Sequence, residues 1–152
     1  MSEGLRFERD QDDPVESPGT RLEFAAIALG GAIGACLRRA AYLPLANSGE
    51  GALWPAIAST LAINVMGALA LGALLSLIES RTAHPLLRPF LAVGVLGTFT
   101  TYSTMIFENG AIASEIGPNE AVLHLLLSIT LGWTAFAIGH RIVDRFGERV
   151  RT

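Results

Sequence analysis

The sequence predicts an all-α integral membrane protein with four transmembrane helices, and two observations carry this prediction. Four apolar blocks, at about residues 22–43, 54–78, 86–112 and 120–143, each have the length that a helix needs to cross a bilayer. The chain contains no lysine, and its eleven arginines gather near the two ends and in short connectors. A helical bundle in water needs charge along the outer face of its helices, so this distribution indicates lipid as the solvent.

Polar segments flank the four blocks. Residues 1–21 mix both charges and contain proline and glycine, so we predict a disordered acidic tail there. This tail lacks the apolar core of a secretion signal, and we expect no cleavage in it. Residues 144–152 form a short basic tail. Residues 22–143 then hold the whole transmembrane domain.

The first block combines small residues with a basic end. Gly30 and Gly34 lie four residues apart, a spacing that lets helix backbones approach closely. Arg38 and Arg39 follow near the end of the block. Their side chains either snorkel to the membrane interface or form a positive vestibule, an entrance that attracts anions. The single cysteine, Cys36, excludes an intramolecular disulfide and a multi-thiolate metal site.

The second block, with the motif "STLAINVMGALALG", contains one strongly polar side chain, Asn64. An amide in hydrocarbon is costly unless it is hydrogen-bonded or lines a wet cavity. Two interpretations remain open for Asn64. It bonds a neighbouring helix, or it donates to an ion.

The third block contains "GVLGTFTTYSTMIFE", residues 94–108. Its glycines and β-branched threonines weaken a helix, so we expect a break in the middle of the membrane that frees backbone groups to bind an ion. The candidate site residues are Gly97, Thr98, Thr100, Thr101, Tyr102, Ser103, Thr104, Met105 and Glu108. Tyr102 and Met105 are three residues apart and share a helix face. The alternative for the hydroxyls is that they bond carbonyls of their own helix.

The fourth block carries His124 and Ser128, four residues apart and therefore on one face. The alternative for His124 is a histidine whose polar groups are satisfied at the membrane interface.

The membrane orientation follows from the arginines. Nine lie on the side of the two chain ends and the second connector, and only Arg38 and Arg39 lie on the other side. The positive-inside rule therefore predicts cytoplasmic termini in a cell membrane.

The buried polar groups favour an anion as the ligand, because donors (an amide, hydroxyls and an arginine) outnumber acids. Glu108 is the only acid deep in a span. A small multidrug exporter needs an acid in its first span, and Glu23 lies only at the edge of that span. In a membrane enzyme, Ser103 and His124 would serve as nucleophile and base. The sequence identifies no third catalytic residue and no G-x-S-x-G motif for such an enzyme. No phosphate-binding loop of the GxxxxGK[ST] type is present. A purely structural membrane subunit stays open as a third alternative.

Over residues 24–140 these motifs resemble the Fluc, or CrcB, family of fluoride channels. "GGAIGACLRR" resembles the family's first-helix glycine motif, Asn64 occupies its asparagine position, and "GVLGTFTTYSTMIFE" resembles its third-helix signature. "SITLGWTAFAIG" resembles its fourth-helix serine–glycine pattern. The resemblance implies a passive fluoride-exporting channel that relieves fluoride toxicity, with no enzymatic activity, no organic cofactor and no nucleic-acid partner.

The resemblance also implies an antiparallel dimer with two pores at the subunit interface. A central structural sodium ion would bind the backbone carbonyls of Gly97 and Thr100. Asn64 would donate to fluoride, and aromatic edges would line the pore. A polar track would include Thr101, Ser103, Thr104 and Ser128.

Several positions depart from the family pattern. Tyr102 and Met105 replace two phenylalanines, Thr98 replaces a glycine, His124 replaces a tyrosine and Arg39 replaces an aromatic residue. Members encoded by a single gene have nearly balanced charge on their two sides, and this chain does not. We therefore hypothesise that it inserts in one orientation and pairs with an oppositely oriented paralogue.

Overall fold

The computed structural model describes residues 18–46, 53–79 and 84–151. The elements in chain order are α1 (Pro18–Ala46), α2 (Leu53–Glu79), the π-helix η1 (Arg88–Leu96), α3 (Gly97–Phe99), α4 (Tyr102–Glu115) and α5 (Pro118–Arg151). The described residues contain no strand. Four segments are long and apolar enough to cross a membrane: Gly19–Tyr42, Leu53–Glu79, Arg88–Glu115 and Pro118–Arg145. The prediction of four membrane-spanning helices is confirmed.

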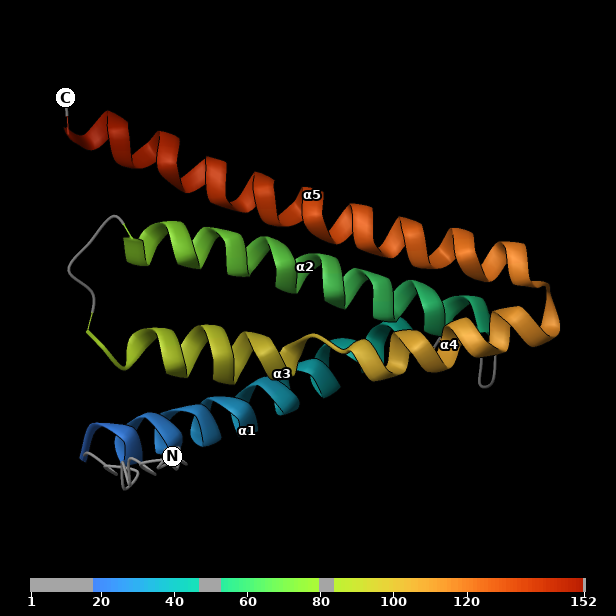
Figure 1. Cartoon of the computed structure of the whole chain (residues 1–152), viewed down its shortest axis with the longest axis horizontal. Coiled ribbons are helices and arrows are strands. Elements are labelled where there is room, and N and C mark those ends of the chain that lie inside the picture. The colour runs from blue at the N-terminus through green and yellow to red at the C-terminus, as the bar shows by residue number, and fades with distance from the viewer. Residues whose placement is uncertain (1–17, 47–52, 80–83, 152) are drawn as a thin grey trace, which may run out of the picture.

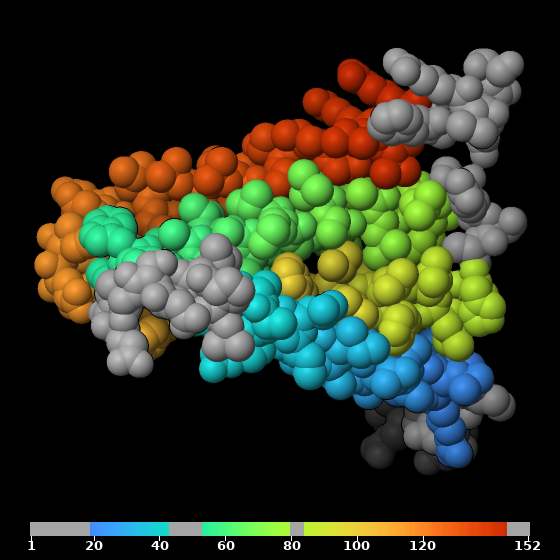
Figure 2. All heavy atoms as spheres, turned by 180° about the vertical axis from the view of Figure 1, so that it is seen from behind, coloured from blue at the N-terminus to red at the C-terminus, as the bar shows by residue number. Residues whose placement is uncertain are grey.

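The four spans run alternately in opposite directions (Figure 1). α2 lies between α5 and the third span, which consists of η1, α3 and α4, and α1 packs against η1 and α3. The view from behind shows α2 and α5 side by side along most of their length (Figure 2). Because the number of spans is even, the start of α1 and the end of α5 lie on the same side, together with the end of α2.

The helices extend beyond the predicted blocks at both ends of the chain. α1 begins at Pro18, so residues 18–21 of the predicted tail are helical. Proline suits the first turn of a helix, since its missing N–H would have no partner there. Residues 1–17 lie outside the described part. α5 continues to Arg151, so residues 144–151 of the predicted basic tail prolong this helix, and residue 152 lies outside the described part.

Glycine allows the closest helix contacts. A Cβ on Gly30 would collide with the carbonyl oxygen of Phe90, so α1 and η1 touch through backbone atoms. A Cβ on Gly72 would likewise collide with the carbonyl oxygen of Phe136 in α5. Gly30, which the sequence marked as a packing position, therefore serves a contact within the chain, and Gly72 serves another.

Large apolar side chains cover the outside of the bundle. Trp133 is 75% exposed and Phe107 is 79% exposed, and long stretches of α1 and α5 expose leucine and isoleucine. The buried set contains small polar residues, among them Ser59, Thr60 and Ser76. This inverted distribution suits a protein whose outer surface faces lipid, where polar groups are satisfied inside.

Candidate functional site

The third span is interrupted between Phe99 and Tyr102. Thr100 has φ −76° and ψ 158°, and Thr101 has φ −142° and ψ 119°, so both residues are extended. The wide π-helical turns of η1 precede the interruption, and β-branched threonines at 98, 100 and 101 have low helix propensity. The extended pair separates α3 from α4 and interrupts the run of regular helical hydrogen bonds.

The carbonyls of Gly97 and Thr100 lose their regular helical donors at this interruption. In a continuous helix, Gly97 O would accept from the N–H of Thr101, and Thr100 O from that of Thr104. The N–H of Thr101 instead donates to the side chain of Asn64, and the N–H of Thr104 donates to Thr101 Oγ1 at 3.3 Å. Both carbonyl oxygens thereby lose their helical donors, and Thr100 O accepts from Arg38 Nη1 at 3.4 Å instead.

Asn64, on α2, holds the extended segment in place. Its Nδ2 donates to the carbonyl oxygen of Thr101 at 2.9 Å, and its Oδ1 accepts from the N–H of Thr101 at 2.8 Å. A side-chain amide has one acceptor and two N–H groups. The second N–H of Asn64 has no partner among the described residues, so this group is available to a ligand while the helix–helix bond stays intact.

Thr101 also begins α4. Its Oγ1 accepts from the N–H of Thr104, as an N-cap does, and donates to Thr104 Oγ1 at 2.9 Å. Ser103 Oγ lies 3.5 Å from the same Thr101 oxygen. Three of the predicted pore hydroxyls therefore form one connected group at the start of α4.

The hydroxyls of Thr98 and Thr100 are used differently. Thr100 Oγ1 donates to the carbonyl of Leu96 at 3.1 Å, within its own span. Thr98 Oγ1 lies 2.8 Å from the carbonyl of Gly94 and 3.0 Å from that of Gly31 on α1. The alternative that hydroxyls bond carbonyls of their own helix thus holds for these two residues, and Thr98 also ties the third span to α1.

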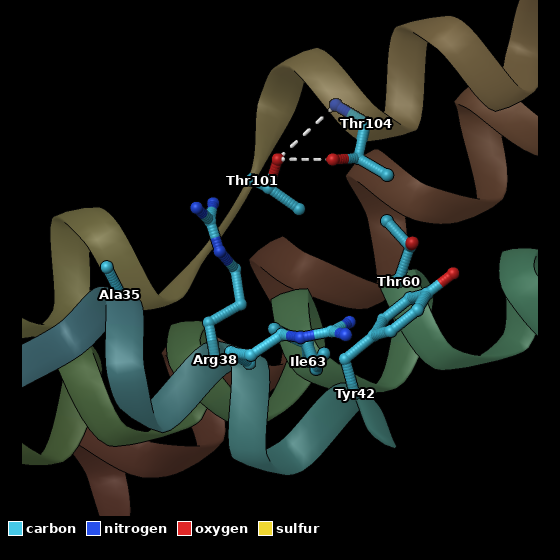
Figure 3. Close-up of a pocket in the computed structure, with 8 residues that line it drawn as sticks. Ala35, Arg38, Tyr42, Thr60, Ile63, Thr101 and Thr104 are labelled. Carbon is cyan, nitrogen blue, oxygen red and sulfur yellow. Dashed lines mark hydrogen bonds between the residues drawn. The ribbon is translucent and has the colours of Figure 1, made fainter. Parts of the chain in front are cut away.

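A depression of about 270 Å³ lies on one side of the interruption. Its lining residues are Ala35, Arg38, Arg39, Tyr42, Thr60, Ile63, Thr101 and Thr104. In Figure 3, Arg38 and Tyr42 of α1 lie across the depression from Thr101 and Thr104. Arg38 Nη1 donates to the carbonyl of Thr100 at 3.4 Å. The two arginines give this entrance positive charge, as the vestibule interpretation of Arg38 requires.

A second depression, of about 200 Å³, also includes Thr101 in its lining. Its lining residues are Asn64, Thr100, Thr101, Tyr102 and Met105. Tyr102 is 72% exposed, whereas Met105 is 8% exposed. The two side chains border one depression, in agreement with their predicted common face. Thr101 is shared by both depressions, so it marks the point where they approach each other.

Glu108 lies inside the bundle beside the larger depression. Its side chain is 4% exposed, and its Oε1 accepts from Thr60 Oγ1 at 2.6 Å. Its Oε2 is buried and has no partner in the described part of the chain. Thr60 was not among the predicted site residues, although it lies one helical turn before Asn64 and therefore on the same face.

His124 and Ser128 form a separate group. His124 Nδ1 lies 3.1 Å from Asn109 Oδ1 and joins α5 to α4. Ser128 Oγ donates to the carbonyl of His124 at 2.8 Å. Neither residue lines the two depressions at Thr101. Ser103 contacts Thr101 rather than His124, so the two residues do not form a nucleophile–base pair here.

Comparison with known proteins gives a consistent result over this region. The family model described as "CrcB-like protein, Camphor Resistance (CrcB)" matches residues 25–140. The matched range contains both depressions and the interrupted span.

Curated proteins match most of the chain. The "Fluoride-specific ion channel FluC" of Idiomarina loihiensis is 39% identical over 110 residues, which cover 72% of this chain and 83% of that protein. The "Fluoride-specific ion channel FluC 2" of Thermobifida fusca is 35% identical over 136 residues, covering 84% and 96%. A "Fluoride-specific ion channel FluC" of Chloroflexus aurantiacus is 39% identical over 123 residues, which cover 80% of this chain and 95% of that protein.

Proposed function

Because the chain belongs to the family of CrcB-like proteins, we propose that it is a subunit of a fluoride-selective channel through which fluoride leaves the cell passively. The resemblance of its motifs to this family is confirmed by the family match and by curated relatives of that name. An ion channel is not an enzyme, so the function lies in binding and passage rather than in a catalysed reaction.

The observation that carries the proposal is the Asn64–Thr101 pair. It places a spare amide N–H next to a cluster of hydroxyls at the interruption of the third span. Fluoride is small and strongly hydrated, so a selective pore must replace its water shell with short bonds from donors. Asn64, Thr101, Ser103 and Thr104 supply donors of this kind, and Tyr102 adds a phenol. Ser128, which faces His124, would belong to a more distant part of the track.

The charge of the larger depression supports an anion as the permeating species. Arg38 and Arg39 line this depression. The buried Glu108 is hydrogen-bonded to Thr60. A positive patch in a concave site raises the local concentration of anions. A permeating anion would therefore meet positive charge first and neutral donors next.

Passive flow is sufficient for export. Fluoride enters cells as its neutral conjugate acid and is trapped as the anion at higher internal pH. An inside-negative potential of about 100 mV drives one anion outward with about 2.3 kcal/mol. Such a channel would relieve fluoride toxicity without an energy source, in a cell membrane with both termini of this subunit cytoplasmic.

The carbonyls of Gly97 and Thr100 lack their helical donors, which supports them as ligands of the proposed structural sodium ion. Arg38 Nη1, which lies 3.4 Å from Thr100 O, would have to leave that oxygen when sodium binds. Sodium is a hard cation that prefers oxygen ligands, and these two oxygens have lost their helical donors. Two oxygens are too few for a sodium ion, so a second subunit would have to complete the coordination. Bound there, sodium would supply a fixed positive charge that joins the two interrupted spans.

A second, antiparallel subunit also suits the exposed surface of α4. Tyr102 and Phe107 are largely exposed, and the smaller depression includes Tyr102 in its wall. A partner on this face would close that wall into a pore. The charge bias of the chain favours an oppositely oriented paralogue as this partner.

Fluoride efflux from liposomes tests the proposed function. Vesicles that contain the full chain alone are loaded with fluoride, and efflux is followed with a fluoride electrode, with chloride-loaded vesicles as the control. We expect fluoride-selective efflux that Asn64→Asp abolishes, because this change removes both amide N–H groups. If the chain alone is silent, it is co-expressed with an oppositely oriented paralogue. Silence of that pair would overturn the fluoride assignment.

A further inference from the structure

Far from the interruption, four polar side chains join the end of α2 to α5, on the side where α1 begins and α5 ends (Figure 1). His140 Nε2 lies 3.5 Å from Glu79 Oε2, and His140 Nδ1 lies 3.1 Å from Asp144 Oδ2. Ser76 Oγ donates to Asp144 Oδ1 at 2.5 Å. Ser76 and Glu79 belong to α2, and His140 and Asp144 belong to α5. The group therefore forms a continuous polar link between two helices.

The link depends on the protonation of His140. A neutral imidazole has one N–H and can donate from only one nitrogen, whereas the imidazolium ion donates from both. Both neighbours of His140 are carboxylates, which have no proton to offer at neutral pH. Only the charged form of His140 can therefore form an ion pair with Glu79 and with Asp144 at the same time.

No other described charge competes from the helices packed against this part of α5. α5 packs against α2, whose only charged residue is Glu79, and against α4. The two acids of α4 lie elsewhere: Glu108 bonds Thr60, and Glu115 adjoins the start of α5, roughly 33 Å from His140 along the helix. On α5 itself, Arg141 and Arg145 are exposed. Residues 80–83, which include Arg81, lie outside the described part.

The surrounding packing explains why this link matters. Just before the polar group, a Cβ on Gly139 would collide with the carbonyl oxygen of Leu69, so the two backbones touch there. The ring of Phe136 lies 6.3 Å from that of His140. His140 itself is 32% exposed and lies five residues before the end of the apolar segment Pro118–Arg145. This position near the edge of the span puts the group that links the two helices within reach of protons from solution.

We propose that Ser76, Glu79, His140 and Asp144 form a pH-sensitive latch between α2 and α5. At acid pH the imidazolium ion holds both carboxylates and the helix ends stay together. Without the positive charge of the imidazolium ion, both ion pairs are lost and the neighbouring carboxylates repel. The latch is independent of the proposed fluoride conduction, although α2 also carries Asn64.

Thermal unfolding of the full chain in detergent tests the latch. The unfolding midpoint is followed through the fluorescence of Trp54 and Trp133 between about pH 5.5 and about pH 8, where imidazole titrates and carboxylates do not. We expect the midpoint to fall by about 2 °C as pH rises, and this fall to disappear in His140→Gln. His84→Gln, at an exposed histidine of the same side, is the matched control and should retain the wild-type fall.

Two further variants test the latch if His140→Gln does not fold. Glu79→Gln and Asp144→Asn each leave His140 with one carboxylate, so each should reduce the fall in midpoint. An unchanged fall in His140→Gln, or in both carboxylate variants, would overturn the latch. A wild-type midpoint that rises with pH relative to that of His140→Gln would overturn it as well, because the imidazolium ion is the linking form.

Discussion

The side-chain amide of Asn64 pairs with both backbone polar groups of Thr101, at 2.9 and 2.8 Å. The pairing resembles the way two strands bond each other, and here it takes place between a helix and two extended residues. It satisfies the backbone where the third span is interrupted, which is a requirement inside a bilayer. The same amide borders the smaller depression, so one residue both maintains the interruption and faces its proposed ligand.

This pairing predicts a graded loss of stability at position 64. Asn64→Asp keeps an acceptor for the N–H of Thr101 but loses the donor to its carbonyl, whereas Asn64→Leu loses both bonds. Each unsatisfied backbone group costs about 1–3 kcal/mol. We expect both variants to unfold more readily than the wild type in detergent, measured by chemical or thermal denaturation. Equal stability of Asn64→Leu and the wild type would contradict the pairing.

The sequence was sufficient for the four spans and for the residues that meet at the interruption. Length and hydropathy determine a span, and the clustering of Thr101, Ser103 and Thr104 is local. The partner of Asn64 was not predictable, because it lies 37 residues away and depends on which helices become neighbours. Periodicity indicates the face of a helix but not the helix that this face meets.

The hydrogen-bond partners of the individual hydroxyls were equally unpredictable from the sequence. Thr98 and Thr101 look alike in the sequence, yet Thr98 bonds carbonyls of η1 and α1, while Thr101 caps α4. The difference arises from the extended backbone, which moves Thr101 away from the preceding carbonyls. The polar link at His140 also went unpredicted, although the three- and four-residue spacings of its members on α2 and α5 were a usable signal.

The contact between α1 and η1 predicts a strong effect of a single methyl group. In Gly30→Ala the new Cβ would overlap the carbonyl oxygen of Phe90, which is backbone and cannot move alone. We expect a loss of about 1–3 kcal/mol in unfolding free energy, as found for overpacked interiors. The matched control is Gly132→Ala, because a Cβ added there would meet no atom within 4 Å and alanine favours a helix. The control should be neutral or stabilising.

The bond between Thr60 and Glu108 predicts energetic coupling. Thr60→Val keeps the shape of the side chain but leaves both carboxylate oxygens of Glu108 without a partner among the described residues. We expect a cost of about 1–3 kcal/mol from this change in the wild-type background. In Glu108→Gln the buried charge is absent, so the same threonine change should cost less. A double-mutant cycle in detergent measures the difference, and strict additivity would show that the pair does not interact.

The arginine pair at the larger depression predicts a charge effect on fluoride flux. Arg38→Gln removes one positive charge from the entrance, and we expect a several-fold lower initial rate of efflux at low ionic strength. Because salt screens such a field, the difference from the wild type should shrink as ionic strength rises toward about 1 M. Arg38→Lys, which keeps the charge and changes the shape, should stay closer to the wild type than Arg38→Gln does. Equal losses in both variants, with no dependence on salt, would instead assign Arg38 to its bond with the carbonyl of Thr100.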